Sequence, residues 1–175
     1  MIKNYGLFWE RNGVFFGELG RGNPASLLGE TVEKRKKVVV NFSRQVGIYC
    51  LYDANFSLLY VGKAGDGNST ILSRLRNHTG NDLAERWTRF SWFGLRPVEK
   101  KGQDHALGET DIKSWTPSLM LRALEGVLIL GAEPSLNRQG ANFSGARKYK
   151  QHWDTDNLYP RQSQMIKDIW DGLPD

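Results

Sequence analysis

The stretch GIYCLYDANFSLLYVGKAG, residues 47–65, says more about the fold than any other part of this chain. Two apolar runs rich in β-branched and aromatic residues flank a polar segment, in which Asp53 and Asn55 have side chains that stabilise turns. The pattern predicts a β-hairpin. It places Tyr49 in the first strand and Tyr60 in the second, so the two phenols can lie side by side.

The residues after the hairpin predict a helix and then a strand. The segment TILSRLRNHTG, residues 70–80, has one apolar side, Ser69 or Thr70 as its N-cap, and Gly80 suited to the C′ position. RFSWFGL, residues 89–95, has the composition of a strand. The order strand, strand, helix, strand is typical of a small α/β (α+β) domain.

A second helix follows a polar segment. Residues 96–114 predict a loop, since they are rich in charged residues and glycine. In residues 115–137, Thr116 is a suitable N-cap, Pro117 suits the first helical position, and Gly131 marks the end before Pro134. The chain thus supplies the two helices that would cover a sheet.

The N-terminal segment reads as β structure. YGLFWERNGVFFGEL, residues 5–19, predicts a hairpin around Asn12 and Gly13, a pair that favours tight turns. Residues 33–42, EKRKKVVVNF, pass from a charged run into a β-branched strand. The charged run is either a solvated face or a place that contacts phosphate.

The tail is basic and aromatic, and it ends in an apolar pattern that predicts a short amphipathic helix with Met165, Ile166, Ile169 and Trp170. We expect three parts: an N-terminal β extension at residues 1–45, a core at 46–140 and the tail at 141–175.

Composition limits the partners and the compartment. The 175 residues suffice for one domain, and 24 Lys and Arg against 19 Asp and Glu give a net charge of +5, which favours an anionic partner. The single cysteine, Cys50, excludes an intrachain disulfide and a zinc site built from cysteines. The start of the chain resembles no signal peptide, and no apolar run has the length of a membrane span. We expect a cytoplasmic protein with no membrane partner.

Glu125 is out of place in its predicted helix. Its neighbours at i−4, i−1 and i+3 are Leu121, Leu124 and Leu128, so we expect its carboxylate on or beside the buried face. A buried carboxylate needs a cation. The candidates are Arg122 on the same helix, a Lys or Arg distant in sequence, or a metal ion.

Five elements in order resemble the GIY-YIG nuclease family. They are GIY at residues 47–49, YVG at 60–62 with Val in place of Ile, RL at 74–75, Glu125, and Asn137 shortly after a proline. The resemblance covers residues 46–138. It implies a three-stranded antiparallel sheet flanked by helices, in a stand-alone enzyme of the restriction-endonuclease or phage-defence kind.

The resemblance also implies roles in phosphodiester hydrolysis. Glu125 would hold Mg²⁺, with Mn²⁺ as a substitute, and Arg74 would contact the non-bridging phosphate oxygens. Tyr49 would be the general base, with Lys63 lowering its pKa, and Tyr60 would orient the water or contact phosphate. Four residues would support the site: Gly47, Gly62, His78 and Asn137. Each of these residues alone has an ordinary structural interpretation, as core, turn or solvated surface.

Duplex DNA is the substrate class that the resemblance implies, and a homodimer or sequential nicking would cut both strands. The candidates for DNA contact are Lys34, Arg35, Lys36, Lys37, Arg76, Lys100, Lys101, Arg147, Lys148 and Lys150. Two other classes stay open: a non-catalytic nucleic-acid-binding module, and a protein-interaction domain that keeps the fold.

Overall fold

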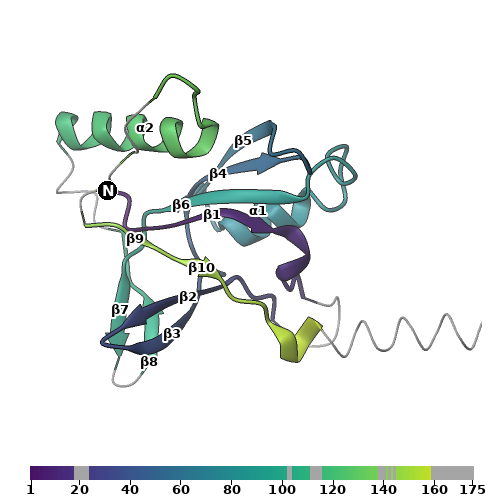
Figure 1. Cartoon of the computed structure of the whole chain (residues 1–175). Coiled ribbons are helices and arrows are strands. Elements are labelled where there is room, and N and C mark those ends of the chain that lie inside the picture. Colours follow the sequence, from purple (N-terminus) through teal and green to yellow (C-terminus); the bar gives the residue numbers. More distant parts are fainter. Residues whose placement is uncertain are drawn as a thin grey trace, which may run out of the picture.

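The computed structural model describes residues 1–17, 24–101, 104–110, 116–137, 141, 143 and 145–158, the side chain of Lys101 excepted. These residues form ten strands and two α-helices, together with one turn of 3-10 helix (Figure 1). The mixed α+β class expected from the sequence is confirmed. The predicted amphipathic segment around Met165 and Trp170 lies outside the described residues.

The central sheet has five strands in the order β5-β4-β6-β1-β9. Its members are β4 (Gly47–Tyr52), β5 (Leu58–Ala64), β6 (Arg89–Gly94), β1 (Asn4–Glu10) and β9 (Arg147–Lys148). All neighbours are antiparallel except β1 and β9. The sheet is therefore larger than the three-stranded one expected, because β1 and β9 extend it beyond β6.

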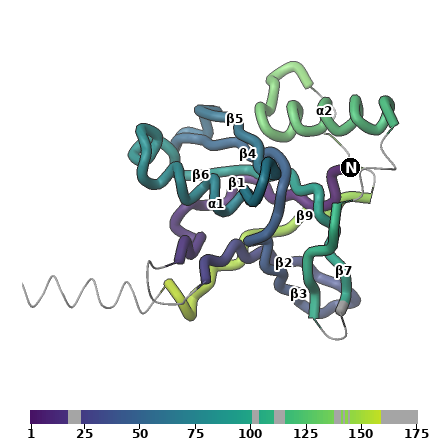
Figure 2. Tube along the Cα trace, turned by 180° about the vertical axis from the view of Figure 1, so that it is seen from behind, coloured from purple at the N-terminus to yellow at the C-terminus, as the bar shows by residue number. Residues whose placement is uncertain are grey.

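Two smaller sheets lie together on one side of the central sheet in both Figure 1 and Figure 2. One has the order β10-β2-β3 and contains β2 (Leu28–Glu33), β3 (Lys36–Asn41) and β10 (Lys150–Gln151). The other is a hairpin of β7 (Val98–Lys101) and β8 (Asp104–Leu107). The loop predicted for residues 96–114 thus contains two strands, since Val98 and Leu107 pair across the hairpin and pack against the core.

The two helices cover opposite faces of the central sheet. α1 (Ile71–Asn77) lies behind the sheet in Figure 1 and before it in Figure 2, and it packs on the face that carries Tyr49. α2 (Pro117–Ala132) packs on the face that carries Cys50. Because successive side chains of a strand point to opposite faces, neighbours in the GIY motif belong to different cores.

Local signals placed these elements well. Asp53 Oδ1 accepts hydrogen bonds of 2.8 Å from the backbone N–H groups of Asn55 and Ser57, which closes the predicted β4–β5 hairpin. Thr70 caps α1 in a capping box with Ser73, and Thr116 caps α2. Gly80 was misplaced, because α1 ends at His78 in a right-handed conformation that needs no glycine.

The hairpin predicted around Asn12 and Gly13 is wrong. These residues form the 3-10 turn η1 (Arg11–Gly13), and β1 pairs with β6 and β9 instead of with the residues that follow it. Gly13 is buried beneath the side chains of Gln151 and Trp153, which leaves no room for a side chain there. Long-range pairing has overridden a local turn signal.

Among the described residues, neither helix is long and apolar enough to cross a membrane.

Candidate active site

The β4–β5 hairpin brings the two tyrosines of the motifs together. Tyr49 pairs with Gly62 across the strands, and Tyr60 lies diagonally from it on the same face, with 6.1 Å between the ring centroids. A Cβ on Gly62 would overlap the Tyr49 phenol. The glycine of YVG is therefore the floor on which the Tyr49 ring lies.

Gly47 is required for a different reason. Its φ of +146° is in the region that favours glycine, and a Cβ there would overlap the backbone oxygen of Phe93 on β6. The residue thus allows β4 to approach β6 closely at the start of the strand. Both motif glycines support the position of Tyr49.

α1 adds a histidine to the two phenols. The helix buries Ile71, Leu72 and Leu75, and it ends at His78, whose ring is buried beside the hairpin. His78 Nε2 is 2.8 Å from Tyr49 Oη, and its ring centroid is 4.9 Å from that of Tyr60. His78, predicted as a supporting residue, therefore contacts both tyrosines.

Arg74 gives the cluster its charge. It is exposed on α1, one turn before His78, and its guanidinium acts on the pKa of Tyr49, His78 and Asp66. We call Tyr49, Tyr60, Arg74 and His78 the tyrosine cluster. Arg76 is exposed two positions further along α1, so it projects from a different side of the helix.

Burial controls the protonation of the cluster. It raises the pKa of Tyr49 to about 12, with a contribution from Tyr60 and a smaller opposing effect of Arg74. Burial also lowers the pKa of His78, and the charge of Arg74 adds to that effect. At neutral pH the Tyr49 phenol is protonated and the His78 ring is neutral.

The predicted role of Lys63 is wrong. Lys63 lies three residues after Tyr60 on β5, so its side chain points to the opposite face of the sheet from both phenols. It is exposed and forms a 2.8 Å ion pair with Asp66, which lowers the pKa of that carboxyl. The cation that does act on Tyr49 is Arg74.

The buried face of α2 also differs from the prediction. The helix packs through its small residues, while Leu121, Leu124 and Leu128 are 67%, 54% and 65% exposed. The residues that face the sheet are Ala123, Gly126, Val127 and Gly131. A Cβ on Gly126 would overlap the ring of Phe143, so the contact is too close for leucines.

Glu125 is consequently exposed, and it does not lie on or beside the buried face. α2 covers the opposite face of the sheet from Tyr49, and Asn137 is exposed in a turn beyond the end of α2. The described residues contain no group of three metal-ligating side chains. In this arrangement they do not fit a Mg²⁺ ion held between Glu125 and the phenols.

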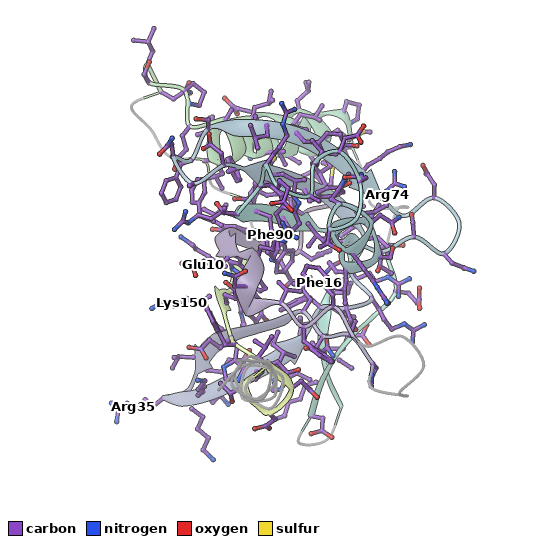
Figure 3. All side chains as sticks on the ribbon, turned by 90° about the vertical axis from the view of Figure 1, so that its right-hand side faces the viewer. Glu10, Phe16, Arg35, Arg74, Phe90 and Lys150 are labelled. Atoms are coloured by element: carbon purple, nitrogen blue, oxygen red, sulfur yellow. The ribbon has the colours of Figure 1, made fainter. Side chains whose placement is uncertain are left out.

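The predicted DNA contacts form a surface of their own. Figure 3 shows Arg35 and Lys150 on one side of the molecule and Arg74 on the other. Lys37 pairs with Glu30 at 2.5 Å, and Arg147 pairs with Glu33, so the charge of these two is partly balanced. The other described members with exposed side chains are Lys34, Arg35, Lys36, Lys100, Lys148 and Lys150. We call this set the basic surface.

The tip of the β2–β3 hairpin is unusual. Lys34 and Arg35 have φ of 45° and 67°, as the two central residues of a type I′ turn require. Asn and Gly adopt this turn with little strain, whereas lysine and arginine each do so at a cost of about 1 kcal/mol. The turn keeps two adjacent cations despite that cost.

Sequence reasoning missed Asn81. Its amide nitrogen lies 3.0 Å from His78 Nδ1, on the side of the ring away from Tyr49. No motif marks this residue, because it lies in a turn after α1. The spacing of three residues from a buried histidine was the available signal.

Comparison with models of protein families, with curated proteins and with solved structures finds no match to this chain. The assignment of a function therefore rests on the residues and their geometry.

Proposed function

We propose that this chain is a DNA endonuclease of the restriction or phage-defence type, which hydrolyses phosphodiester bonds of duplex DNA. One observation carries the proposal: two phenols, an imidazole and an exposed guanidinium from β4, β5 and α1 meet around Gly62. These are the residues that the GIY, YVG and RL motifs supply. A purely structural explanation would not need an exposed arginine beside buried titratable rings.

Arg74 is the group that would contact phosphate. Its planar fork suits two phosphate oxygens, and its permanent charge would stabilise the charge that develops on them during hydrolysis. The side chain is exposed, so DNA can reach it without a rearrangement of the core.

Tyr60 is the better candidate for the general base. Tyr49 has 0% exposure and cannot touch a phosphate in this structure, whereas Tyr60 is only partly buried and lies further out. In the proposed step, the oxygen of a water molecule bonds to phosphorus while the bond to the 3′ oxygen breaks. The Tyr60 phenolate takes the proton of the water, and the leaving oxygen takes a proton from solvent.

No step of this reaction runs through a metal ion, because Glu125 lies on the other face of the sheet. Mg²⁺, or Mn²⁺ in its place, stays in the proposal as the ion that the resemblance implies, and assays must supply it. A homodimer is proposed on the ground that one cluster per chain cuts one strand at a time, with sequential nicking as the alternative. The cytoplasmic location stays a prediction.

Cleavage of supercoiled and linear duplex DNA tests the proposal. Wild type, Tyr60→Phe and the control Tyr5→Phe are compared with Mg²⁺, with Mn²⁺ and with a chelator. Tyr5 is a partly buried tyrosine on β1, whose ring packs on the other face of the sheet. We expect Tyr60→Phe to cut about 100-fold more slowly than wild type, as the loss of a general base implies, and Tyr5→Phe to cut normally. Equal rates for all three proteins would refute the role of Tyr60.

A non-catalytic DNA-binding module is the second candidate, and the strained Lys34–Arg35 turn favours it. Such a protein would bind duplex DNA with an affinity that falls steeply with salt, and it would leave every substrate uncut. A protein-interaction domain would show no salt-dependent affinity for DNA. Binding and cleavage measured on one preparation separate the three functions.

A further inference from the structure

The amide of Asn81 has only one orientation that satisfies both of its neighbours. Its Oδ1 accepts a hydrogen bond of 3.0 Å from the backbone N–H of Leu83. A backbone N–H is only a donor, so the atom facing it must be the amide oxygen. The amide nitrogen then faces His78 Nδ1 at 3.0 Å.

This orientation decides which nitrogen of His78 carries the proton. The amide nitrogen only donates, so Nδ1 has to accept, and the neutral ring is protonated at Nε2. Nε2 is 2.8 Å from Tyr49 Oη. His78 therefore donates to the phenol oxygen, and the phenol proton has to point elsewhere.

We propose that Asn81 is a positioning residue that holds His78 as a hydrogen-bond donor to Tyr49, so that the Tyr49 hydroxyl donates outward to Tyr60. The chain of donors runs from Asn81 through His78 and Tyr49 to the outermost phenol. Its direction is set at one end by the backbone of Leu83.

The surroundings of the ring agree with this direction. The side chains that face His78 are Tyr49 on β4, Tyr60 on β5, Arg74 on α1 and Asn81 in the following turn. Among these four, only Arg74 is charged at neutral pH, and a cation disfavours a second proton on the ring. Tyr49 and Tyr60 are also in hydrogen-bonding contact, which gives the Tyr49 proton an acceptor.

The consequence for catalysis rests on the proposed function. A ring that already donates to Tyr49 cannot take the proton of that phenol, so His78 is not the base. A Tyr49 hydroxyl that donates to Tyr60 stabilises the Tyr60 phenolate, the form that would accept a proton from water. Asn81 would thus act on the reaction without touching DNA.

Nitrogen NMR of the histidine rings tests the first step without any DNA. The chain has three histidines, and the signals of His105 and His152 are identified by replacing each with Gln. Asn81→Asp keeps the acceptor for Leu83 but puts a carboxylate oxygen where the amide nitrogen was. A carboxylate accepts, so the ring proton moves to Nδ1. Asn77→Asp is the control, since it adds the same charge to an exposed position one residue before His78.

We expect the neutral His78 ring to carry its proton on Nε2 in wild type and in Asn77→Asp, and on Nδ1 in Asn81→Asp. A wild-type ring protonated at Nδ1 would overturn the proposal, and this result needs no variant to fold. An Asn81→Asp ring that keeps its proton on Nε2 would overturn it as well.

The pH dependence of DNA cleavage tests the second step. In Asn81→Asp the Tyr49 hydroxyl donates to His78 and no longer to Tyr60, so the rise of rate with pH should move up by about one unit relative to Asn77→Asp. Identical profiles of the two variants would refute the link to Tyr60. If wild type cuts no DNA, the proposed function fails, while the ring spectra still decide the role of Asn81.

Discussion

Replacing Gly62 by alanine adds one carbon atom beneath the phenol of Tyr49. The added Cβ would overlap three atoms of the ring, and the ring has no space to move because Tyr49 is 0% exposed. Forcing an extra carbon into a packed site costs about 1–3 kcal/mol. Displacing the ring also weakens the hydrogen bond between Tyr49 and His78, which contributes about 1 kcal/mol.

We therefore expect Gly62→Ala to lower the free energy of unfolding by about 3 kcal/mol, which corresponds to a fall of about 6–12 °C in Tm for a chain of this size. Urea unfolding of wild type, Gly62→Ala and Gly80→Ala measures it. Gly80 is the control, because a Cβ there would meet nothing within 4 Å and its φ is not positive. A change below about 0.5 kcal/mol for Gly62→Ala would refute the packing of Tyr49 on Gly62.

Three further predictions concern charge. Because burial raises the pKa of Tyr49 from 10.0 to about 12, its contribution of about 2–3 kcal/mol is fully present below pH ~10 and is lost by pH ~12. Alkaline unfolding of Tyr49→Phe should lack that loss, and parallel curves would contradict the shift. Glu125→Gln should cut DNA within about threefold of wild type, since the side chain is exposed on the far face; a loss of 100-fold would show that α2 brings it to the phosphate. Lys34→Asn/Arg35→Gly should stabilise the protein by about 1–2 kcal/mol by relieving the turn. The same variant should flatten the salt dependence of DNA binding, and an unchanged slope would exclude the tip of the hairpin from the contact.

The sequence was sufficient for structure that neighbouring residues determine. The turn of the β4–β5 hairpin follows from one carboxylate, Asp53, and the starts of both helices follow from Thr70 and Thr116. Pairing of Tyr49 and Tyr60 on one face follows from the geometry of the hairpin. Alternation along β5 could also have shown that Lys63 points away from the phenols, and this signal was overlooked.

Contacts between distant segments could not be predicted in this way. The periodicity of α2 offers its leucines as the buried face, but the ring of Phe143 fits against Gly126, and the small residues are buried instead. β1 leaves its local turn because β6 and β9 are available on either side. The position of Glu125 depends on both effects, so its predicted place beside the phenols did not follow.

The rate of DNA cleavage by two arginine variants of α1 tests the central claim most directly. Arg74→Gln and Arg76→Gln remove the same charge from exposed positions two residues apart, and only Arg74 acts on the titration of Tyr49 and His78. Single-turnover cleavage of one duplex is measured for both variants and for wild type with Mg²⁺. We predict that Arg76→Gln cuts at nearly the wild-type rate and that Arg74→Gln is about 100-fold slower. Equal rates for the two variants, or intact DNA with all three proteins, would contradict the account.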